Sequence, residues 1–450
     1  MQRSLWLRRF AVLMVFGLLA AACGGDDDPD TTDTETGTPT ETEMTETETE
    51  TDTETETEGQ ATGANVDGTL KIGTLLPQTG ALAQFGPGMQ FGVELAVQQI
   101  NEAGGVLGGD VELVTADSGT DPQVANDAVD GLLQSDNVDA IVGAASSDIT
   151  KAVIEKVISA EVAECSPSNT GPDFTTFEDE DPGFYFRTAP SDALQGQVLG
   201  NLVLADGFQN VGLVYRNEAY GQGLANQVKE TIENGGGTVA VEVPYDPRST
   251  GPFDAEAEQL AQADLDAVVS VMFIDDGAAM INAAIEKGVG PGDVQWYGAD
   301  GTASDDFPEA VSEENPTILD GMKGTAPDFS SQSEAFSSAF DEGAPENAQN
   351  TFAPQAYDCA IIIALAAQIA GSDDPNDFMQ EVVGVTKDGE KCDSFAACKE
   401  LIDGGTTDID YDGASGSLSF APPGEPAAGT YTIYQFTDGD VENLRQESVG

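Results

Sequence analysis

Short apolar runs alternate along the chain with longer segments in which apolar residues recur every three or four positions. The short runs predict buried strands, and the longer segments predict amphipathic helices. Strand and helix follow each other without a hairpin signal, which is typical of a parallel, doubly wound sheet. The elements predicted for the first half are strand 69–76, helix 88–103, strand 111–117, helix 122–134, strand 139–143 and helix 149–160.

The same alternation begins again after residue 188 and predicts a second α/β lobe. Residues 325–403 are mainly helical in pattern and cannot form a sheet layer alone, so we expect them to pack on the first lobe. The chain would then cross between the lobes three times. The predicted fold is α/β, with two Rossmann-like lobes whose parallel sheets are flanked by helices and joined by a three-crossing hinge. The second series comprises helix 192–205, strand 210–215, helix 221–234, strand 238–244, helix 255–262, strand 267–273, helix 277–287 and strand 295–298.

Polar residues follow two neighbouring strands of the first lobe. Ser146 and Ser147 come after strand 139–143, and Ser168, Asn169 and Thr170 come after the next strand. The carboxyl ends of parallel strands meet at one edge of a sheet, where open α/β sheets hold ligands. Hydroxyls and backbone N–H groups at a helix N-terminus would suit a carboxylate. The alternative is that these residues only cap helices and form turns.

The N-terminus has the pattern of an export signal. Basic residues precede the apolar run 10–22, which is too short for a typical membrane span. The sequence Leu-Ala-Ala-Ala-Cys, ending at Cys23, resembles the bacterial lipobox, which predicts a lipid-anchored, extracytoplasmic protein. An ordinary signal with a chance cysteine is the alternative. The apolar segment 360–370 is expected to be a buried helix.

Composition excludes several functions. The chain has 81 Asp and Glu against 16 Lys and Arg, a formal charge of −65, which disfavours nucleic acid and anionic membranes as partners. Residues 26–60 are almost wholly Thr, Asp and Glu and are expected to form a disordered stalk. The chain contains no His, so it lacks the usual general base and the commonest metal ligand. No cofactor motif is present, and we expect neither a cofactor nor an enzyme.

Four cysteines remain after Cys23, and an exported protein permits disulfides. Cys392 and Cys398 flank a short loop and favour a local bridge, which leaves Cys165 and Cys359 for a long-range one. Four cysteines allow three pairings, and this is the pairing that we favour. A zinc site is the less favoured alternative.

The motifs together resemble one known family. The collinear segments KIGTLLPQTGALAQFGPG, NEAGGVLGGDVELVTADSGTDP, IVGAASS, SPSNTGPDFT, FRTAPSDALQG, YGQGLA, GADG and AYDCAIIIAL are similar to the leucine/isoleucine/valine-binding proteins, which deliver solutes to ABC importers. The resemblance covers nearly all of residues 69–436. It implies the type I periplasmic binding protein fold, with ligand in the cleft between the lobes.

The resemblance also implies the residues of a ligand site. Ser147 and Thr170 match positions that hold the ligand carboxylate, and the backbone carbonyl of Ser168 matches one that receives the ammonium. Asp300 matches an acidic position that pairs with that ammonium, and Tyr220 matches a cleft-closing aromatic. The aromatic residues that fall near the ligand in the family pattern are Phe85, Phe273 and Phe352.

Three of these positions depart from the family pattern. Asp300 is one methylene shorter than Glu, so the ammonium would sit deeper or a water would bridge. Phe85 and Phe273 replace tyrosines that are frequent in the family, which would make the pocket more apolar.

The predicted organisation has five parts. These are a lipoprotein signal (1–22), a lipid-anchored Cys with an acidic stalk (23–68), an N-terminal lobe (69–188 with 325–415), a C-terminal lobe (189–324 with 416–436) and a tail (437–450). We expect a binding protein that presents an apolar amino acid or related zwitterion to ABC permease subunits. A receptor of the same fold that serves a sensor or chemoreceptor, and a site for an amide or urea, are alternatives. An enzyme on a Rossmann-like fold is a remote one.

Overall fold

The computed structural model describes residues 64, 66–176, 183–249, 251–328, 332–422 and 424–450. The predicted signal peptide, Cys23 and nearly all of the predicted stalk lie outside these residues. The described chain begins where residues 67–69 donate three backbone N–H groups to one oxygen of the Asp373 carboxylate, at 2.6 to 3.1 Å. This clamp attaches the start of the first strand to the globular part of the protein.

The first sheet is parallel, as predicted. Its five strands lie in the order β2-β1-β3-β4-β5, with β1 at the switch point between two directions of winding. Successive side chains along the strands enter opposite faces, so Leu75 and Ile141 belong to one core, while Ile72 and Val142 belong to another. The strands are β1 (Lys71–Leu76), β2 (Glu112–Asp117), β3 (Ala140–Gly143), β4 (Ala163–Ser166) and β5 (Tyr185–Arg187).

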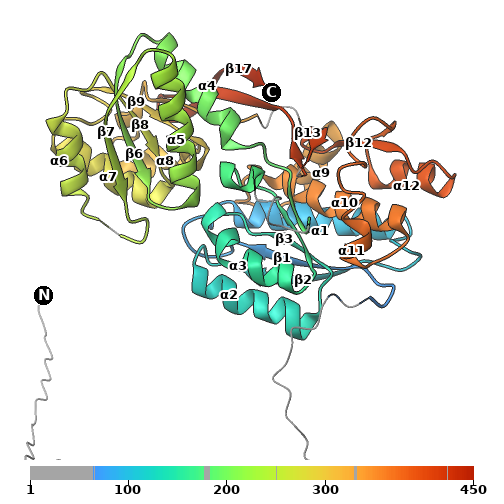
Figure 1. Cartoon of the computed structure of the whole chain (residues 1–450). Coiled ribbons are helices and arrows are strands. Elements are labelled where there is room, and N and C mark those ends of the chain that lie inside the picture. The colour runs from blue at the N-terminus through green and yellow to red at the C-terminus, as the bar shows by residue number, and fades with distance from the viewer. Residues whose placement is uncertain (1–63, 65, 177–182, 250, 329–331, 423) are drawn as a thin grey trace, which may run out of the picture. The chain divides into compact units, whose positions relative to one another are not determined.

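Helices cover both faces of this sheet (Figure 1). On one face lie α2 (Pro122–Gly131) and α3 (Ser147–Ser159), and on the other lie α1 (Gly86–Glu102) and α10 (Ala353–Ala370). The helix predicted at 122–134 is α-helical only as far as Gly131, and the π-helical turn η1 (Leu132–Asp136) follows it. The helical segment after residue 325 therefore packs on the first lobe, as predicted.

Helix α10 is the one helix of the described chain that is long and apolar enough to cross a membrane. It has 18 residues, so it is longer than the apolar segment 360–370 suggested. Its side chains are buried against α1 and the first sheet, and 83% of the apolar window is covered by the rest of the protein. The helix therefore serves as the core of the first lobe.

The second sheet is mixed, not purely parallel. Its seven strands lie in the order β17-β16-β10-β9-β8-β6-β7, and the pairs β10–β16 and β16–β17 are antiparallel. Helices α4 and α5 pack on one face, and α6 and α7 pack on the other. The strands are β6 (Asn210–Arg216), β7 (Thr238–Tyr245), β8 (Ala267–Val271), β9 (Gln295–Gly298), β10 (Lys323–Pro327), β16 (Gly429–Thr437) and β17 (Asp440–Val449).

The remaining elements are helices of both lobes and short strands near the crossings. Those of the second lobe are α4 (Asp192–Ala205), α5 (Ala219–Asn234), α6 (Asp254–Gln262), α7 (Ile274–Glu286), η4 (Asp300–Thr302), α8 (Asp306–Val311) and η5 (Pro316–Leu319). The others are η2 (Pro172–Thr175), α9 (Glu334–Gly343), α11 (Pro375–Phe378), α12 (Phe395–Asp403), β11 (Glu390–Cys392), β12 (Ile409–Gly413), β13 (Gly416–Ser417), β14 (Phe420–Ala421) and β15 (Glu425–Pro426).

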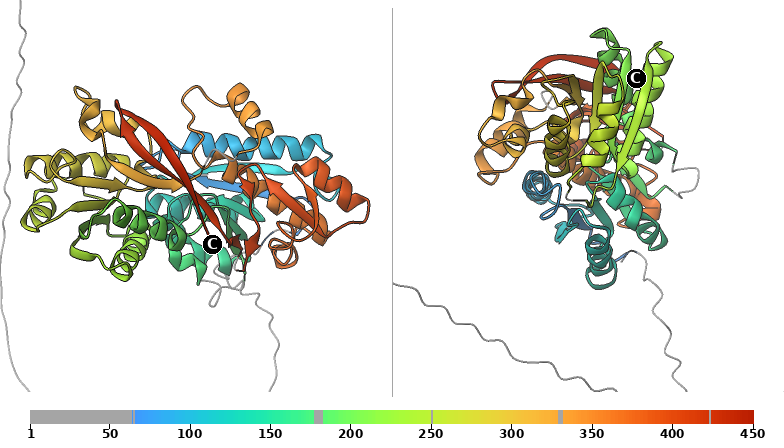
Figure 2. Two further views of the ribbon diagram at one scale, coloured as in Figure 1. Left: turned by 90° about the horizontal axis from the view of Figure 1, so that it is seen from above. Right: turned by 90° about the vertical axis from the view of Figure 1, so that its left-hand side faces the viewer.

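Three predicted boundaries need correction. The predicted tail 437–450 is wrong, because β17 pairs with β16 along a long antiparallel hairpin (Figure 2). The polar side chains of β17 are mostly exposed at the sheet edge, so they carry no strand periodicity. Strand β10, split by the predicted boundary at residue 325, belongs wholly to the second sheet. Gly416 and Ser417 pair with β12, and the carbonyl of Gly424 accepts the backbone N–H of Arg187 in β5, so the third crossing comes later than residue 416.

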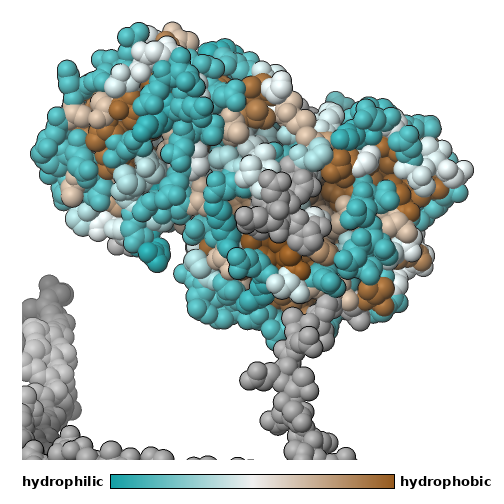
Figure 3. Space-filling model, in the orientation of Figure 1, coloured by the Kyte–Doolittle hydropathy of each residue, from teal (hydrophilic) through white to brown (hydrophobic). Residues whose placement is uncertain are grey.

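Two disulfides bridge the described cysteines in the predicted pairs. Cys165 in β4 is bonded to Cys359 in α10, and their Cα atoms are 5.8 Å apart. Cys392 at the end of β11 is bonded to Cys398 in α12. The visible surface in Figure 3 is mainly hydrophilic, in keeping with the excess of acidic residues.

Candidate ligand-binding site

The two polar turns predicted after β3 and β4 lie side by side and are joined by hydrogen bonds. The hydroxyl of Ser166 donates to the carbonyl of Ala144, and the hydroxyl of Ser168 donates to that of Ala145 at 3.0 Å. The amide of Asn169 donates to both carbonyls and is itself held by the Tyr185 hydroxyl. These bonds fix the backbone of both turns, so the hydroxyl of Ser168 has a structural role.

Ser147 and Thr170, the residues predicted to bind a carboxylate, lie in these two turns. Ser147 is the first residue of α3, and its Oγ accepts the backbone N–H of Gly171 at 3.2 Å. Because that bond uses a lone pair, the Ser147 proton is available to another acceptor. Ser147 lies at the N-terminus of α3, where the helix dipole favours an anion. The side chains of Ser147 and Thr170 are both buried.

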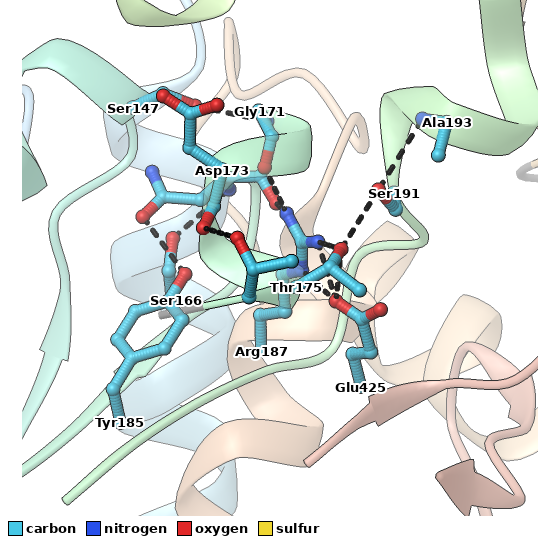
Figure 4. Close-up of polar contacts among 12 residues, drawn as sticks. Ser147, Ser166, Gly171, Asp173, Thr175, Tyr185, Arg187, Ser191, Ala193 and Glu425 are labelled. Carbon is cyan, nitrogen blue, oxygen red and sulfur yellow. Dashed lines mark hydrogen bonds and ion pairs between the residues drawn. The ribbon is translucent and has the colours of Figure 1, made fainter. Parts of the chain in front are cut away.

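A buried arginine holds the turn that carries Thr170 (Figure 4). We call Ser147 and Thr170, with the turns that carry them, the carboxylate seat. Arg187 at the end of β5 donates to the carbonyls of Asn169 and Gly171, which flank Thr170, at 3.1 and 2.9 Å. Its guanidinium also pairs with Glu425 of β15 and donates to the hydroxyl of Thr175 at 3.0 Å. The turn that carries Thr170 is therefore tied to β5 and β15, the segments that lead into two of the lobe crossings.

An acidic group lies on the second lobe. Asp300 follows β9 in the turn η4, and its Oδ1 accepts hydrogen bonds from the Tyr220 hydroxyl at 2.9 Å and from the Gln195 amide at 3.0 Å. Burial raises the pKa of Asp300, although these hydrogen bonds oppose the shift. Asp192 in the first turn of α4 is also buried, and burial together with the charge of Asp300 raises its pKa well above the usual range.

Aromatic side chains lie near these polar groups. Tyr220 stacks on Phe273 with 5.6 Å between the ring centroids. The guanidinium carbon of Arg216, the last residue of β6, lies 3.9 Å from the centroid of the Phe273 ring. Phe85 and Phe352 meet edge to face at 6.4 Å. Phe352 has φ = 59°, an uncommon conformation for a bulky residue.

One cavity brings all eight predicted ligand-site residues together. It contains about 380 Å³ of space between protein atoms, part of it open to solvent. Residues of both lobes line it. The lining residues are Leu82, Phe85, Met89, Ala145, Ser146, Ser147, Ser168, Thr170, Tyr220, Phe273, Asp300, Gly301 and Phe352.

The sequence did not point to several members of this site. Leu82 and Met89 line the cavity from the loop before α1 and from α1, where they are indistinguishable in pattern from core residues. Gln195 lies within the motif FRTAPSDALQG, and that motif was the only sequence feature that pointed to a role for Gln195 in the site. Arg216 packs its guanidinium against the ring of Phe273, and the spacing of these two residues in the sequence does not predict this contact.

The cavity is lined by neutral hydroxyl groups from the first lobe, a carboxyl group from the second and apolar side chains. Such an arrangement can hold a small zwitterion. Across the described residues, no three or more Cys, Asp or Glu side chains are placed to share a metal ion.

Comparison with known proteins agrees with this architecture. The family model described as periplasmic binding protein matches residues 69–440. The chemotactic signal transduction system substrate-binding protein BasB of Halobacterium salinarum is 27% identical over 382 residues, which cover 82% of this chain and 88% of that protein. The leucine-, isoleucine-, valine-, threonine- and alanine-binding protein of Pseudomonas aeruginosa is 28% identical over 314 residues, covering 68% and 80%.

Solved structures share the fold. The leucine-binding protein LivK of Thermotoga maritima superposes with a TM-score of 0.69 at 20% identity, covering 84% of this chain and 98% of that one. LivJ of Streptococcus pneumoniae, solved with isoleucine, gives 0.67 at 24%, covering 85% and 99%. A solute-binding protein of Rhodopseudomonas palustris, solved with 4-hydroxybenzoate, gives 0.67 at 19%, covering 85% and 97%.

Proposed function

Because the chain belongs to the periplasmic binding protein family, we propose that its cavity binds an amino acid with a branched or otherwise apolar side chain for delivery to an ABC importer. Family membership itself makes the protein an extracytoplasmic, non-enzymatic solute-binding protein of the ABC-transport type. The identity of the solute is the proposal.

The observation that carries the proposal is the placement of Asp300 and the Ser147–Thr170 turns in one cavity. Hydroxyls and helix N–H groups can hold a carboxylate without a full positive charge. A buried carboxylate needs a cation, and the ligand ammonium would supply it. Charge complementarity therefore favours a ligand that carries both the carboxylate and the ammonium group of an amino acid.

The apolar walls indicate the kind of side chain. Leu82, Phe85, Met89 and Phe352 are buried and line the same cavity. They offer no charged partner, so a long charged side chain would be desolvated without compensation. A branched aliphatic or aromatic side chain fits this chemistry. The names of the P. aeruginosa relative and of LivJ with isoleucine support the same choice.

Aromatic acids are the main competing ligands, since a protein of the same fold holds 4-hydroxybenzoate. An aromatic acid has no ammonium for Asp300, which would then remain buried without a cation. Amides and urea lack the carboxylate that the Ser147 seat suits. These solutes are therefore the informative negative controls.

A second candidate role is supported by one relative. BasB is named as part of a chemotactic signal transduction system, so the same cavity could present an amino acid to a chemoreceptor instead of a permease. The ligand is the same in both roles, and the docking partner differs. Anchoring through a lipid on Cys23 is part of the proposal and suits either role.

A calorimetric titration of the full protein tests the ligand. Leucine, isoleucine, valine and phenylalanine are compared with 4-hydroxybenzoate, benzoate, leucinamide and urea at one salt concentration. We expect micromolar or tighter binding of at least one amino acid and none of the other solutes at the same concentrations. Binding of benzoates without binding of amino acids would overturn the zwitterion proposal.

A further inference from the structure

A contact between the lobes lies directly beside the cavity. Helix α5 of the second lobe packs against α3 and η2 of the first. At the contact, Gly223 of α5 faces the ring of Pro172, the first residue of η2. A Cβ atom added to Gly223 would lie 2.4 Å from Cδ and 3.1 Å from Cγ of Pro172. The missing side chain of Gly223 is thus what lets the two backbones approach.

The two contact residues are adjacent to ligand-site residues on both sides. Tyr220 precedes Gly223 by about one helical turn, so the two share a face of α5. Pro172 follows Thr170 by two residues, and the intervening Gly171 is bonded to Ser147. The separation between α5 and η2 therefore sets the distance between Tyr220 and the carboxylate seat.

From this geometry we infer that Gly223 is a positioning residue, whose lack of a side chain permits the lobes to close fully on the ligand. Carbon atoms in contact lie about 3.5 to 4.0 Å apart, so a methyl group at 223 would push α5 from Pro172 by roughly 1 Å. The cavity would widen on the side of Tyr220. This inference rests on the proposed function, because it takes closure around a solute as the purpose of the contact.

Gly223→Ala separates this role from a role in folding. Gly223 lies inside a helix with ordinary right-handed backbone angles, where alanine is the better helix former. The ligand-free variant should therefore melt at the temperature of the wild type or slightly above it. Its affinity for the cognate amino acid should nevertheless fall by about tenfold or more, mainly through faster dissociation.

Two further variants make the test specific. Pro172→Ala removes Cγ and Cδ, so the double variant Gly223→Ala/Pro172→Ala should recover most of the lost affinity. Gly131→Ala is the matched control, since Gly131 ends α2 and a Cβ there meets nothing within 4 Å. Gly131→Ala should bind like the wild type.

Calorimetry gives the affinities, and hydrogen exchange of residues 168–176 and 218–228 measures closure in the same full-length proteins. Wild-type affinity in Gly223→Ala, or no recovery in the double variant, would overturn the inference. If the wild type binds no amino acid, the proposed function fails instead. Exchange in the ligand-free proteins then decides the inference, because Gly223→Ala loosens the contact with Pro172 and should make residues 168–176 exchange faster, and unchanged exchange there would overturn it.

Discussion

The hydroxyl of Tyr220 donates a hydrogen bond to Oδ1 of Asp300, with 2.9 Å between the oxygens. Tyr220 lies near the start of α5 and Asp300 follows β9, so the bond joins two parts of the second lobe at the wall of the cavity. Gln195 of α4 donates to the same oxygen. The acidic group is therefore oriented by the protein alone, before any ligand arrives.

Replacing Asp300 tests the charge at this end of the cavity. Asp300→Ala leaves a ligand ammonium buried without a partner and should weaken binding by roughly 2 to 5 kcal/mol. Asp300→Asn keeps the size and removes the charge, so most of the loss should remain. Thr170→Ala removes one hydroxyl while backbone N–H donors stay, and should cost only roughly 1 to 2 kcal/mol, about tenfold.

Calorimetry of the three variants with the cognate ligand measures these losses. Wild-type affinity in Asp300→Asn would mean that the solute carries no ammonium at this position. A larger loss for Thr170→Ala than for Asp300→Ala would place the dominant charge contact in the first lobe.

Ligand binding should release a proton. Burial raises the pKa of Asp300, and burial with the neighbouring charge of Asp300 raises the pKa of Asp192. An ammonium beside Asp300 favours its ionised form and lowers that pKa again. The bound state then holds fewer protons than the free state, so affinity rises with pH across the range in which the free protein titrates.

Titrations in two buffers of different ionisation enthalpy measure the released proton directly. Asp192→Asn removes the second buried carboxyl group beside Asp300, together with its share of the released protons, and should reduce the release. Proton uptake on binding an amino acid would contradict this account.

The stability of the protein should fall as the pH rises toward 7. Burial, together with the charges of Asp373 and Asp67, raises the pKa of Asp139 to about 7, although a hydrogen bond from the Lys71 backbone opposes the shift. The unfolded chain has an ordinary Asp pKa near 3.9. Between these values the folded state binds the extra proton, so its advantage is full below about pH 4 and is lost through pH 7.

Asp139→Asn removes this titration and keeps an oxygen for the Lys71 N–H. Its free energy of unfolding should exceed that of the wild type by about 1 to 4 kcal/mol at pH 8, and the difference should shrink at pH 5. Denaturant unfolding at both pH values provides the measurement, with the exposed Asp127→Asn on α2 as control. An equal stability difference at pH 5 and pH 8 would show that Asp139 does not titrate between them.

The bridge between Cys165 and Cys359 should contribute more stability than the bridge between Cys392 and Cys398. It spans 194 residues and joins β4 to α10, whereas the second bridge spans six. A longer closed loop restricts the unfolded chain more, so the double alanine variant of the long bridge should lose about 2 to 5 kcal/mol. The matched variant is Cys392→Ala/Cys398→Ala, which should lose less.

Thermal unfolding compares the two variants, and peptide mapping without reduction identifies the pairs. Alkylation of Cys165 in the native protein would show that the long bridge is not formed.

Much of the site was predictable because it depends on local sequence and on sheet topology. The turns with Ser147 and Thr170 follow two adjacent strands of one parallel sheet, and topology alone brings such turns together. Their motifs, with those around Tyr220 and Asp300, matched a family pattern, and all eight candidate residues line the cavity. Strand and helix positions followed from periodicity wherever one face of an element is buried.

The amino-acid sequence by itself thus determined the α/β lobes and the two polar turns, and it favoured the pairing of the cysteines that the structure shows. Only the tertiary structure decided the features that depend on distant partners. Residues 440–449 form strand β17 because their backbone pairs with that of β16. Their side chains are mostly exposed and do not alternate between apolar and polar residues. Arg187 pairs with Glu425, which lies 238 residues away in the sequence. Gly223 has no room for a side chain because Pro172 of the other lobe lies against it. Such contacts arise from packing between segments that share no local sequence signal, so only the folded arrangement specifies them.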